Sequence, residues 1–382
     1  MNTLQDILPA IRRIHNRAEG ALPLHAPVFS GNERQYVLDT IDSTFVSSVG
    51  AYVTRFEDQL REVTGARHAI ACVNGTAALQ VAMLLAGVQQ GDLVLTQAMS
   101  FVATANAIRH CGAEPVFLDI DAETLGLSVD AVRVFLEKEC ERAAGGCRHI
   151  ATGRRVAACV PMHSFGLPCR VDVLCGLCAT WGVAVVEDAA EALGSTYKGR
   201  HCGTWGLLGT LSFNGNKIIT TGGGGAILTD DDAIGKRARH LTTTAKVPHR
   251  WDFYHDEVAW NYRMPNLNAA LGCAQLERLE EFVAYKRGIS DAYAALFADS
   301  PWQYVRETEG SRSNYWLCAV LFGNEVERDA FLELSNDAGI MTRPVWRLLH
   351  TLPAFRAGLS APRPVAADVA ARLVNLPSGF GE

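Results

Sequence analysis

The sequence predicts an α/β protein with a mostly parallel sheet, and three observations support this class. Between residues 68 and 230, short apolar runs such as HAIACV, DLVLTQ and VAVVED alternate with segments of helical pattern. The runs are apolar throughout, which is typical of parallel strands that are covered on both faces. The chain has 382 residues, enough for a large domain and a smaller companion. In such sheets, ligands bind at the carboxyl ends of the strands.

Three regions are expected along the chain. Residues 1–27 form a helical arm, because apolar residues recur at helical spacing in LQDILPAIRRI. This arm is interrupted by charges and does not resemble a signal peptide. Residues 28–265 form the large domain. Its expected strands are HAIACV, DLVLTQ, EPVFLDI, VAACVPM, VAVVED and GAILTD, and its expected helices include TAALQVAMLLAG, ATANAIRH, VDVLCGLCATWG and the AAEALGS that follows Asp188.

Residues 266–382 form a smaller α+β domain. GCAQLERLEEFVAYKRGISDAYAALF is expected to be one long helix of about two dozen residues. Mixed segments such as NYWLCAVLF and the loop TRPVWRLLHTLPAF follow it.

Composition excludes several function classes. A net charge of -6 and a pI near 6.0 argue against a nucleic-acid or anionic-membrane surface. No run approaches the ~18 to 20 apolar residues of a membrane span, so a soluble, cytoplasmic protein is expected. The cysteines lie in apolar contexts that suit reduced, buried thiols. Cys175 and Cys178 form one CxxC without a second pair, so no metal site is expected.

Polar residues follow two of the predicted strands. Glu187 and Asp188 end VAVVED, where a carboxylate either faces the ligand crevice or caps a helix. Asn74, Gly75 and Thr76 separate a strand from a helix. Free backbone N–H groups and the helix dipole make such a junction a phosphate site, although an ordinary helix cap needs the same residues.

Two further residues complete a candidate site. Phe101 follows another strand and could belong to the core or lie flat on a planar ring. Lys217 stands in SFNGNKIITTGGGGAIL, residues 212–228, in apolar company. Burial favours the neutral, nucleophilic form of an amine, which suits Schiff-base chemistry. The glycines at 222–225 are expected to let the chain turn back around this lysine; no GKS or GKT follows them, as a triphosphate-binding loop would require.

These features fit one cofactor. Pyridoxal 5′-phosphate needs a lysine for its aldehyde, an acid facing its pyridine nitrogen, a phosphate cradle and a flat group against its ring. Lys217, Asp188, the Gly75–Thr76 junction with Ser212, and Phe101 supply these four groups.

The order of VNGTAALQ, SFVATANAI, VEDAAEALGS, SFNGNK with TGGGGAILT, and NYRMPNLNAALGCAQLERL closely resembles the DegT/StrS-type nucleotide-sugar aminotransferases. The similarity runs from about residue 22 to VNLPSG. It implies a pyridoxal-phosphate enzyme of fold type I, the aspartate-aminotransferase fold. Similar proteins usually continue beyond NLPSG into a closing helix, whereas this sequence ends with GFGE.

The resemblance also implies roles for single residues. Lys217 would form the internal aldimine, Asp188 would face the pyridine nitrogen, and Phe101 would stack on the ring. The cofactor phosphate would be bound by Gly75, Thr76 and Ser212, and by Asn261 of a neighbouring subunit, which implies a homodimer with shared active sites. Glu191 stands where many members have glutamine near the phenolic oxygen. His163 matches a loop residue beside the cofactor, and a structural role is the alternative.

The stretches VSSVGAYVTRFE, TTTAKVPH and HDEVAWNYRMPNLNAALGCAQLE resemble the subgroup that aminates 4-keto-6-deoxy sugar nucleotides on routes to bacillosamine or legionaminic-type surface sugars. The leading hypothesis is transfer of the amine of L-glutamate, through pyridoxamine 5′-phosphate, to C4 of a UDP-linked sugar. Lys217 would shuttle the proton. Arg263 is the first candidate for the sugar diphosphate, ahead of Arg343 and Lys246.

Alternatives remain open. The sugar could be linked to GDP or dTDP, with a 3- or 4-keto group. A dehydratase of the same fold would carry histidine in place of Lys217. A non-catalytic regulatory protein of this fold should have lost Lys217, Asp188 or Ser212, and all three are present.

Overall fold

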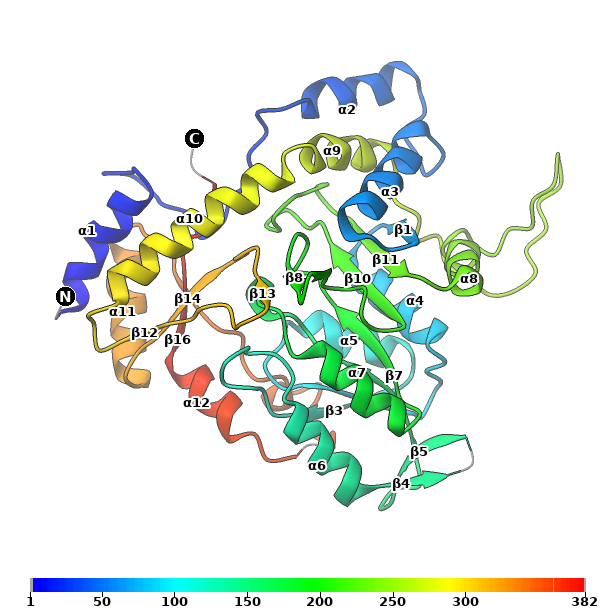
Figure 1. The fold of residues 1–382 in the computed structure, drawn as a ribbon. Helices are drawn as coiled ribbons and strands as arrows, with labels where there is room; N and C mark the ends of the chain where they lie inside the picture. Colours follow the sequence, from blue (N-terminus) through cyan, green and yellow to red (C-terminus); the bar gives the residue numbers. More distant parts are fainter. Residues whose placement is uncertain (1–2, 144, 360, 381–382) are drawn as a thin grey trace.

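The computed structural model describes residues 3–143, 145–359 and 361–380. Its centre is a nine-stranded sheet with the order β1-β11-β10-β7-β6-β2-β3, to which the hairpin β4–β5 is attached beside β6 (Figure 1). Strands β10, β7, β6, β2 and β3 run parallel, whereas β11 is antiparallel to both β10 and β1. This sheet confirms the predicted fold class.

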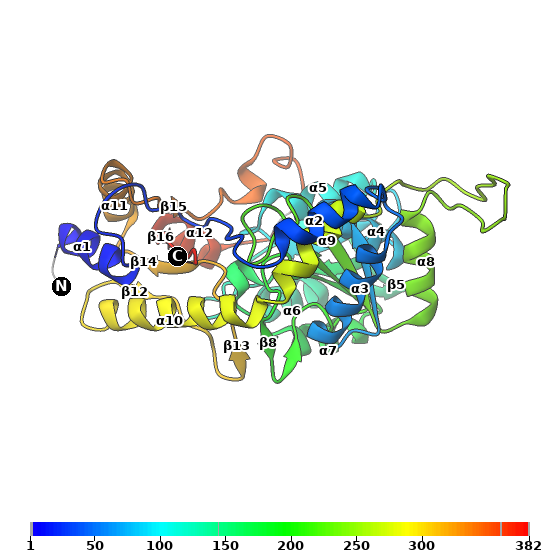
Figure 2. The same ribbon diagram turned by 90° about the horizontal axis from the view of Figure 1, so that it is seen from above.

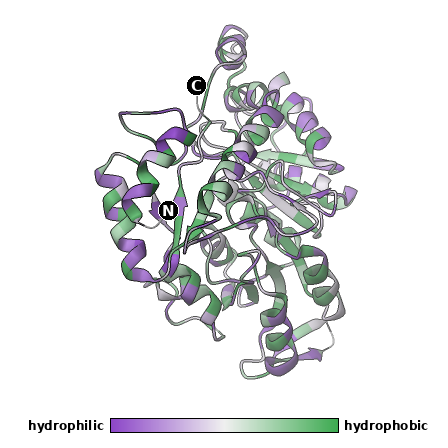
Figure 3. Ribbon diagram, turned by 60° about the vertical axis from the view of Figure 1, so that its left-hand side comes forward, coloured by the Kyte–Doolittle hydropathy of each residue, from purple (hydrophilic) through white to green (hydrophobic). Residues whose placement is uncertain are grey.

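Strands β1, β2, β3, β6, β7 and β11 of the large sheet coincide with the predicted apolar runs, whereas β4, β5 and β10 were not predicted. The nine strands are β1 (His68–Cys72), β2 (Leu93–Gln97), β3 (Glu114–Leu118), β4 (Cys140–Ala143), β5 (Gly146–His149), β6 (Arg155–Val160), β7 (Ala184–Asp188), β10 (Leu208–Ser212) and β11 (Gly225–Thr229). Outside the hairpin β4–β5, most of the strand residues are buried because helices cover both faces, and hydrophobic residues dominate these strands (Figure 3).

The helices of this part are α2 (Glu33–Asp42), α3 (Ala51–Thr64), α4 (Gly75–Leu85), α5 (Val102–His110), α6 (Val129–Glu139), α7 (Val171–Thr180), α8 (Asp232–Thr242) and α9 (Asn266–Leu276). A short 3₁₀ turn, η1 (Ser164–Gly166), follows β6. Helix α4 packs between the sheet and helices α5 and α8, and its alanines allow this close approach. The side chain of Asn74 caps α4 by accepting from the N–H of Ala77.

The second sheet has four strands in the order β12-β14-β16-β15. The strands are β12 (Gln303–Tyr304), β14 (Cys318–Leu321), β15 (Arg343–Pro344) and β16 (Leu373–Leu376), and the surrounding helices are α1 (Leu4–Ile14), α10 (Leu279–Phe297), α11 (Glu325–Asp337) and α12 (Pro364–Arg372). Figure 2 shows these elements to one side of the large sheet. A 3₁₀ turn, η2 (Leu349–Thr351), follows β15 and packs on Ala98, Ala105 and Phe117 on the side of the large sheet. A third, small sheet joins β8 (Thr196–Tyr197), β9 (Arg200–His201) and β13 (Ser311–Arg312).

The N-terminal arm forms the predicted helix, and it packs on the second sheet. Ile7, Ile11 and Leu22 belong to one apolar cluster with residues of α10, α11 and β14. The division of the chain at residues 27 and 265 remains a prediction, and the arm shares its core with the predicted small domain.

Two expectations about helices were wrong. AAEALGS forms turns, because Gly194 takes a left-handed conformation with φ +84° that ends any helical run. The expected long helix is divided into α9 and α10, because Arg278 leaves the helical region with φ -113° and ψ 6°. Among the described residues, no helix is long and apolar enough to cross a membrane.

Candidate active site

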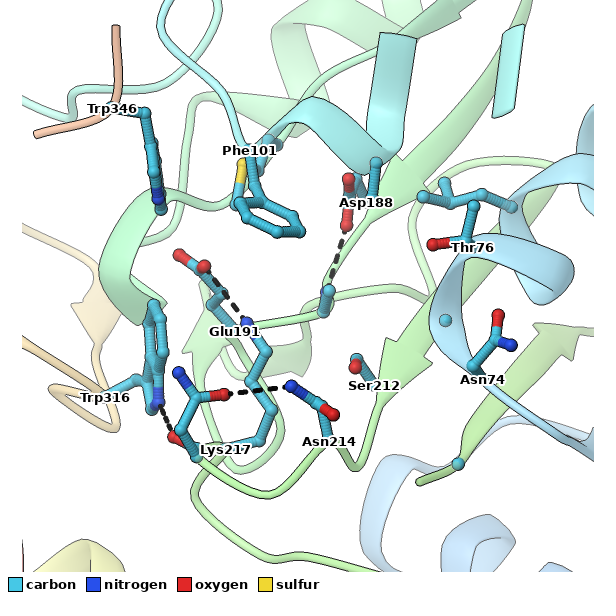
Figure 4. Close-up of a pocket in the computed structure, with 17 residues that line it drawn as sticks. Asn74, Thr76, Phe101, Asp188, Glu191, Ser212, Asn214, Lys217, Trp316 and Trp346 are labelled. Atoms are coloured by element: carbon cyan, nitrogen blue, oxygen red, sulfur yellow. Dashed lines mark hydrogen bonds and ion pairs between the residues drawn. The ribbon is translucent and has the colours of Figure 1, made fainter. Parts of the chain in front are cut away.

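A cavity of about 330 Å³ opens where strands β7 and β10 end and α4 begins (Figure 4). Most of the predicted site residues line it: Gly75, Thr76, Phe101, Asp188, Glu191, Ser212 and Lys217. The parallel strands explain this convergence, because Asp188 ends β7 and Ser212 ends the neighbouring β10.

One wall of the cavity is the N-terminus of α4. The first-turn N–H groups of a helix have no intrahelical acceptors, and Asn74 takes only that of Ala77. A Cβ on Gly75 would lie 3.0 Å from Cβ and 3.2 Å from Oγ of Ser212. The glycine therefore lets the helix N-terminus and the Ser212 hydroxyl meet at one point, which is a suitable cradle for a phosphate.

The glycine run after Lys217 belongs to the same wall. The chain turns back after β10 and returns as β11, so that Gly225 pairs with both Ser212 and Cys72. A Cβ on Gly225 would lie only 2.5 Å from the backbone carbon of Asn74. Gly225 is therefore required by the close approach of β11 to the start of α4.

Lys217 points into the cavity between a carboxylate and an indole (Figure 4). Its Nζ donates to Oε1 of Glu191 at 3.1 Å and lies 3.9 Å from the centre of the Trp316 ring. The Trp316 indole is fixed in turn, because Nε1 donates to the carbonyl of Asn216 at 2.6 Å. The loop that carries the lysine is thus attached to the residue that covers it.

Asp188 is almost fully buried at the end of β7. Its Oδ2 accepts from the hydroxyl of Thr104 at 2.7 Å, and its Oδ1 accepts from the N–H of Ala190 at 3.2 Å. Burial raises the pKa of this carboxyl above its ordinary value, and these two hydrogen bonds oppose the rise. The fixed carboxylate can bind a protonated ring nitrogen.

Glu191 has two contacts that hold its side chain in the wall of the cavity. Oε1 accepts from Lys217, and Oε2 accepts from the N–H of Phe165 at 2.8 Å. Burial raises the pKa of Glu191 to about 7, although the charge of Lys217 acts in the opposite direction. A glutamine has one acceptor oxygen and could not accept at both positions, so these two contacts require the carboxyl group of Glu191.

His163 is fully buried beside the cavity and does not line it. Its Nε2 lies 2.9 Å from Oε2 of Glu187, and its Nδ1 accepts from the N–H of Cys169. Glu187 also accepts from the N–H groups of Gly203, Trp205 and Gly206. This arrangement favours the structural interpretation of His163 over direct contact with a cofactor.

The expectation that Arg263 binds substrate needs correction. Its guanidinium is buried, donates to Glu57 at 2.6 Å and donates to the carbonyl of Ala71 at 3.1 Å. This charge is therefore paired inside the protein and lies outside the cavity.

The other predicted cations also lie elsewhere. Arg343 donates to Asn336 and to the carbonyl of Thr342, and Lys246 lies over the ring of Phe253. Asn261 is exposed on the surface of the protomer. Its predicted contact with the cofactor of a neighbouring subunit remains a prediction.

Several lining residues were not predicted from the sequence. They are Leu79, Ala103, Met162, Ala190, Asn214, Asn216, Trp316 and Trp346, whereas Asn74 and Gly224 belong to the predicted junction and glycine run. The two tryptophans come from the small domain, about a hundred residues or more after Lys217 in the sequence. Their only sequence signal is a large aromatic residue beside polar neighbours in NYWLC and RPVWR.

The residues present fit pyridoxal phosphate. The uncapped N–H groups beside Gly75 suit its phosphate, and the buried carboxylate of Asp188 suits its pyridine nitrogen. The ring of Phe101 is 48% exposed, so that a planar group can lie on it. Lys217 can reach the aldehyde from the opposite wall. The fold and the site thus define a pyridoxal-phosphate enzyme of fold type I.

Comparisons with known proteins agree with this class. The chain belongs to the DegT/DnrJ/EryC1/StrS aminotransferase family, whose sequence profile matches residues 28–381. Members of this family depend on pyridoxal phosphate. The chain is a sugar aminotransferase of this family.

Two similar relatives are named GDP-perosamine synthase. The protein from Escherichia coli O157:H7 is 36% identical over 94% of this chain and 93% of its own length. The protein from Vibrio cholerae is 36% identical over 94% of both chains. Among solved structures, the aminotransferase TlmJ from Streptoalloteichus hindustanus matches with a TM-score of 0.85 and 30% identity over 94% of both chains. The names of the two synthases do not confirm the UDP-linked subgroup.

Proposed function

We propose that the protein transfers the amino group of L-glutamate to the keto carbon of a nucleotide-linked sugar. The observation that carries this proposal is the position of Lys217, whose Nζ lies in the cavity with Asp188 and the N-terminus of α4. Pyridoxal phosphate, when bound, carries the amino group and withdraws electrons from the substrate carbon. The protein supplies the anchoring groups and the movement of protons.

Each residue has a defined task in this proposal. Gly75, Thr76 and Ser212 hold the phosphate, and Asp188 holds the proton on the pyridine nitrogen. Phe101 supports the ring. Lys217 Nζ removes a proton from the donor carbon and returns a proton on the acceptor side.

The nucleotide of the acceptor sugar is proposed from the relatives. Because two similar proteins are named for a GDP-linked sugar, a GDP-linked 4-keto-6-deoxy sugar is the first candidate. A UDP-linked sugar, favoured by the subgroup stretches of the sequence, is the second candidate. A dTDP-linked sugar or a 3-keto sugar is a further alternative.

A second copy of the chain is proposed to complete the assembly. Exposed apolar side chains gather on α2 and the segment that follows it: Leu38, Ile41, Phe45, Val46 and Val49. Such a surface is typical of a protein interface. Asn261, also exposed, would approach the partner's cofactor phosphate. Light scattering coupled to size exclusion should give the mass of a dimer, and a monomer at micromolar concentration would contradict this assembly.

The function is tested in two stages. The holoenzyme is mixed with L-glutamate, and 2-oxoglutarate is measured. The amine-loaded protein, freed of glutamate, is then given GDP-, UDP- or dTDP-linked 4-keto-6-deoxy sugar, and the amino-sugar nucleotide is measured by mass spectrometry. We expect product with one nucleotide above the others. Formation of 2-oxoglutarate without product from any of the three would contradict the sugar acceptor.

The non-catalytic alternative is tested with the same protein. A regulatory protein would bind pyridoxal phosphate or a sugar nucleotide without releasing 2-oxoglutarate. The ion pair between Lys217 and Glu191 and the fixed Asp188 favour the enzyme.

A further inference from the structure

Trp346 presents one face of its indole to the cavity. The residue lies between β15 and η2 in the small domain, is half-buried and lines the cavity beside Phe101 and Glu191 (Figure 4). Its other face packs on Phe165, with ring centres 5.1 Å apart and planes 28° apart. Phe101 meets it edge-on at 6.3 Å, with planes 61° apart.

This indole has rigid support. Phe165 is fully buried, and its N–H donates to Glu191. After Trp346 the chain is fixed to the large domain, because the N–H of Leu349 donates to the carbonyl of Ala98 at 2.9 Å. A flat group that is held from behind and from one end loses little entropy when a ligand covers its free face.

Trp316, the second tryptophan of the cavity, already has a partner on its ring. The Trp316 ring already carries the Lys217 ammonium at 3.9 Å and is itself almost fully buried. Trp346 has no cation over its ring among the described residues. Of these two indoles, Trp346 is therefore the one whose face is available to a ligand.

We propose that Trp346 is a stacking platform for the hexose ring of the acceptor sugar. The proposal rests on the proposed function, which requires the keto carbon to come next to Lys217. The sugar ring carries that carbon, whereas the nucleobase is separated from it by two phosphates. A hexose has an apolar face of C–H groups that can lie on an aromatic ring, while its hydroxyl groups point sideways to polar neighbours.

Polar side chains that could bind the sugar hydroxyl groups line the same cavity. Glu191, Asn214 and Asn216 line the same cavity as Trp346 and can accept or donate hydrogen bonds at the edge of the ring. L-Glutamate is an open chain with two carboxylates and has no comparable apolar face. Trp346 should therefore distinguish a sugar nucleotide from its nucleotide alone, and the contact should favour binding of the sugar ring.

The test separates the contribution of the sugar from that of the nucleotide. Calorimetric Kd values are measured for the pyridoxal-phosphate form of the enzyme with GDP- and UDP-linked 4-keto-6-deoxy sugars, and with GDP and UDP alone. In the wild-type protein one sugar nucleotide should bind more tightly than its nucleotide. Trp346→Ala should weaken binding of that sugar nucleotide about tenfold, which is about 1.4 kcal/mol, and binding of the free nucleotide less than twofold.

Two further variants serve as controls for the effect of Trp346→Ala. Trp346→Phe keeps a flat face and should retain most of the preference for the sugar nucleotide. Trp181→Ala removes a tryptophan that lies outside the cavity under Arg142, and it should change neither Kd. Equal weakening of nucleotide and sugar nucleotide by Trp346→Ala, or no weakening of either, overturns the proposal.

The proposed function can fail separately. Release of 2-oxoglutarate from L-glutamate by the wild-type protein tests the transaminase on its own. If the wild-type protein makes 2-oxoglutarate and prefers a sugar nucleotide, but Trp346→Ala leaves this preference intact, only the platform is wrong. If neither sugar nucleotide binds better than its nucleotide, the platform is refuted, and the two-stage assay with GDP-, UDP- and dTDP-linked sugars decides separately whether a sugar is the acceptor.

Discussion

The substitution Glu191→Gln should lower the stability of the protein slightly at acid pH and raise it at alkaline pH. Burial raises the pKa of this carboxyl from its ordinary value of 4.5 to about 7, against the opposing charge of Lys217. Asp188 is the other charged group that acts on it. Because the folded-state pKa is above the unfolded value, the contribution of Glu191 to stability is fully present below pH 4.5 and is lost as the pH rises through 7.

The size of this effect follows from the shift. A difference of about 2.5 pKa units, at 1.36 kcal/mol for each unit, corresponds to roughly 3 kcal/mol of unfolding free energy. Glutamine stays neutral at every pH, but its single carbonyl oxygen cannot accept from both Lys217 and the N–H of Phe165, which costs about 1 kcal/mol at either pH. Glu191→Gln should therefore be slightly less stable than the wild-type protein at pH 5 and more stable, by on the order of 2 kcal/mol, at pH 8.5.

The assay is urea unfolding of the cofactor-free protein, followed by tryptophan fluorescence at both pH values. Asp172→Asn is the matched control, because Asp172 is paired with Lys198 on the surface. Burial alone would raise the pKa of Asp172, but the hydrogen bond and charge of Lys198, together with hydrogen bonds from Val173 and Tyr197, outweigh burial and lower that pKa. The control should show no gain at alkaline pH. A stability difference for Glu191→Gln that does not change between pH 5 and pH 8.5 would refute the reasoning.

Three other predictions follow from the geometry. Gly75→Ala should weaken pyridoxal phosphate binding about tenfold, because its methyl group would enter the phosphate cradle. The control Gly176→Ala, whose methyl group meets no atom within 4 Å, should bind the cofactor normally. Equal affinities of the two variants by equilibrium dialysis would contradict the cradle. Arg263→Met should lower the unfolding free energy by about 3 kcal/mol, because it breaks the buried pair with Glu57. The same variant should leave the Kd of the sugar nucleotide unchanged. A raised Kd in a stable variant would show that Arg263 binds the substrate. Asp188→Asn should slow single-turnover formation of 2-oxoglutarate about 100-fold while cofactor binding falls far less, and a purely proportional loss of binding would contradict its role.

The residues that sequence analysis found share a simple physical signal. Asp188, Ser212 and Gly75 stand where an apolar run ends or a helix begins, and parallel strands bring these ends to one edge of the sheet. The strands themselves were predictable for the same reason, since burial on both faces requires apolar residues throughout. Local pattern therefore predicted β1, β2, β3, β6, β7 and β11 and the cavity residues at their ends, but it missed β10, the strand that carries Ser212.

The remaining features depend on contacts that no local pattern contains. Trp316 and Trp346, which flank strands β14 and β15 of the second sheet, line the same cavity as residues at the strand ends of the large sheet. Arg263 lies in a polar stretch that resembles a surface segment, yet Glu57, far away in the sequence, pairs with it inside the protein. The break between α9 and α10 has no local signal, because the residues on both sides of Arg278 favour helix.

The role of Lys217 is tested most directly by visible absorbance spectra of the purified protein, reconstituted with pyridoxal phosphate, before and after addition of L-glutamate. Lys217→Ala is measured beside it. The account predicts a yellow wild-type protein whose long-wavelength band bleaches with L-glutamate as 2-oxoglutarate appears, and a variant that shows no such change. A colourless wild-type protein, or a Lys217→Ala protein that bleaches and turns over like the wild type, would contradict the assignment of Lys217 and with it the proposed function.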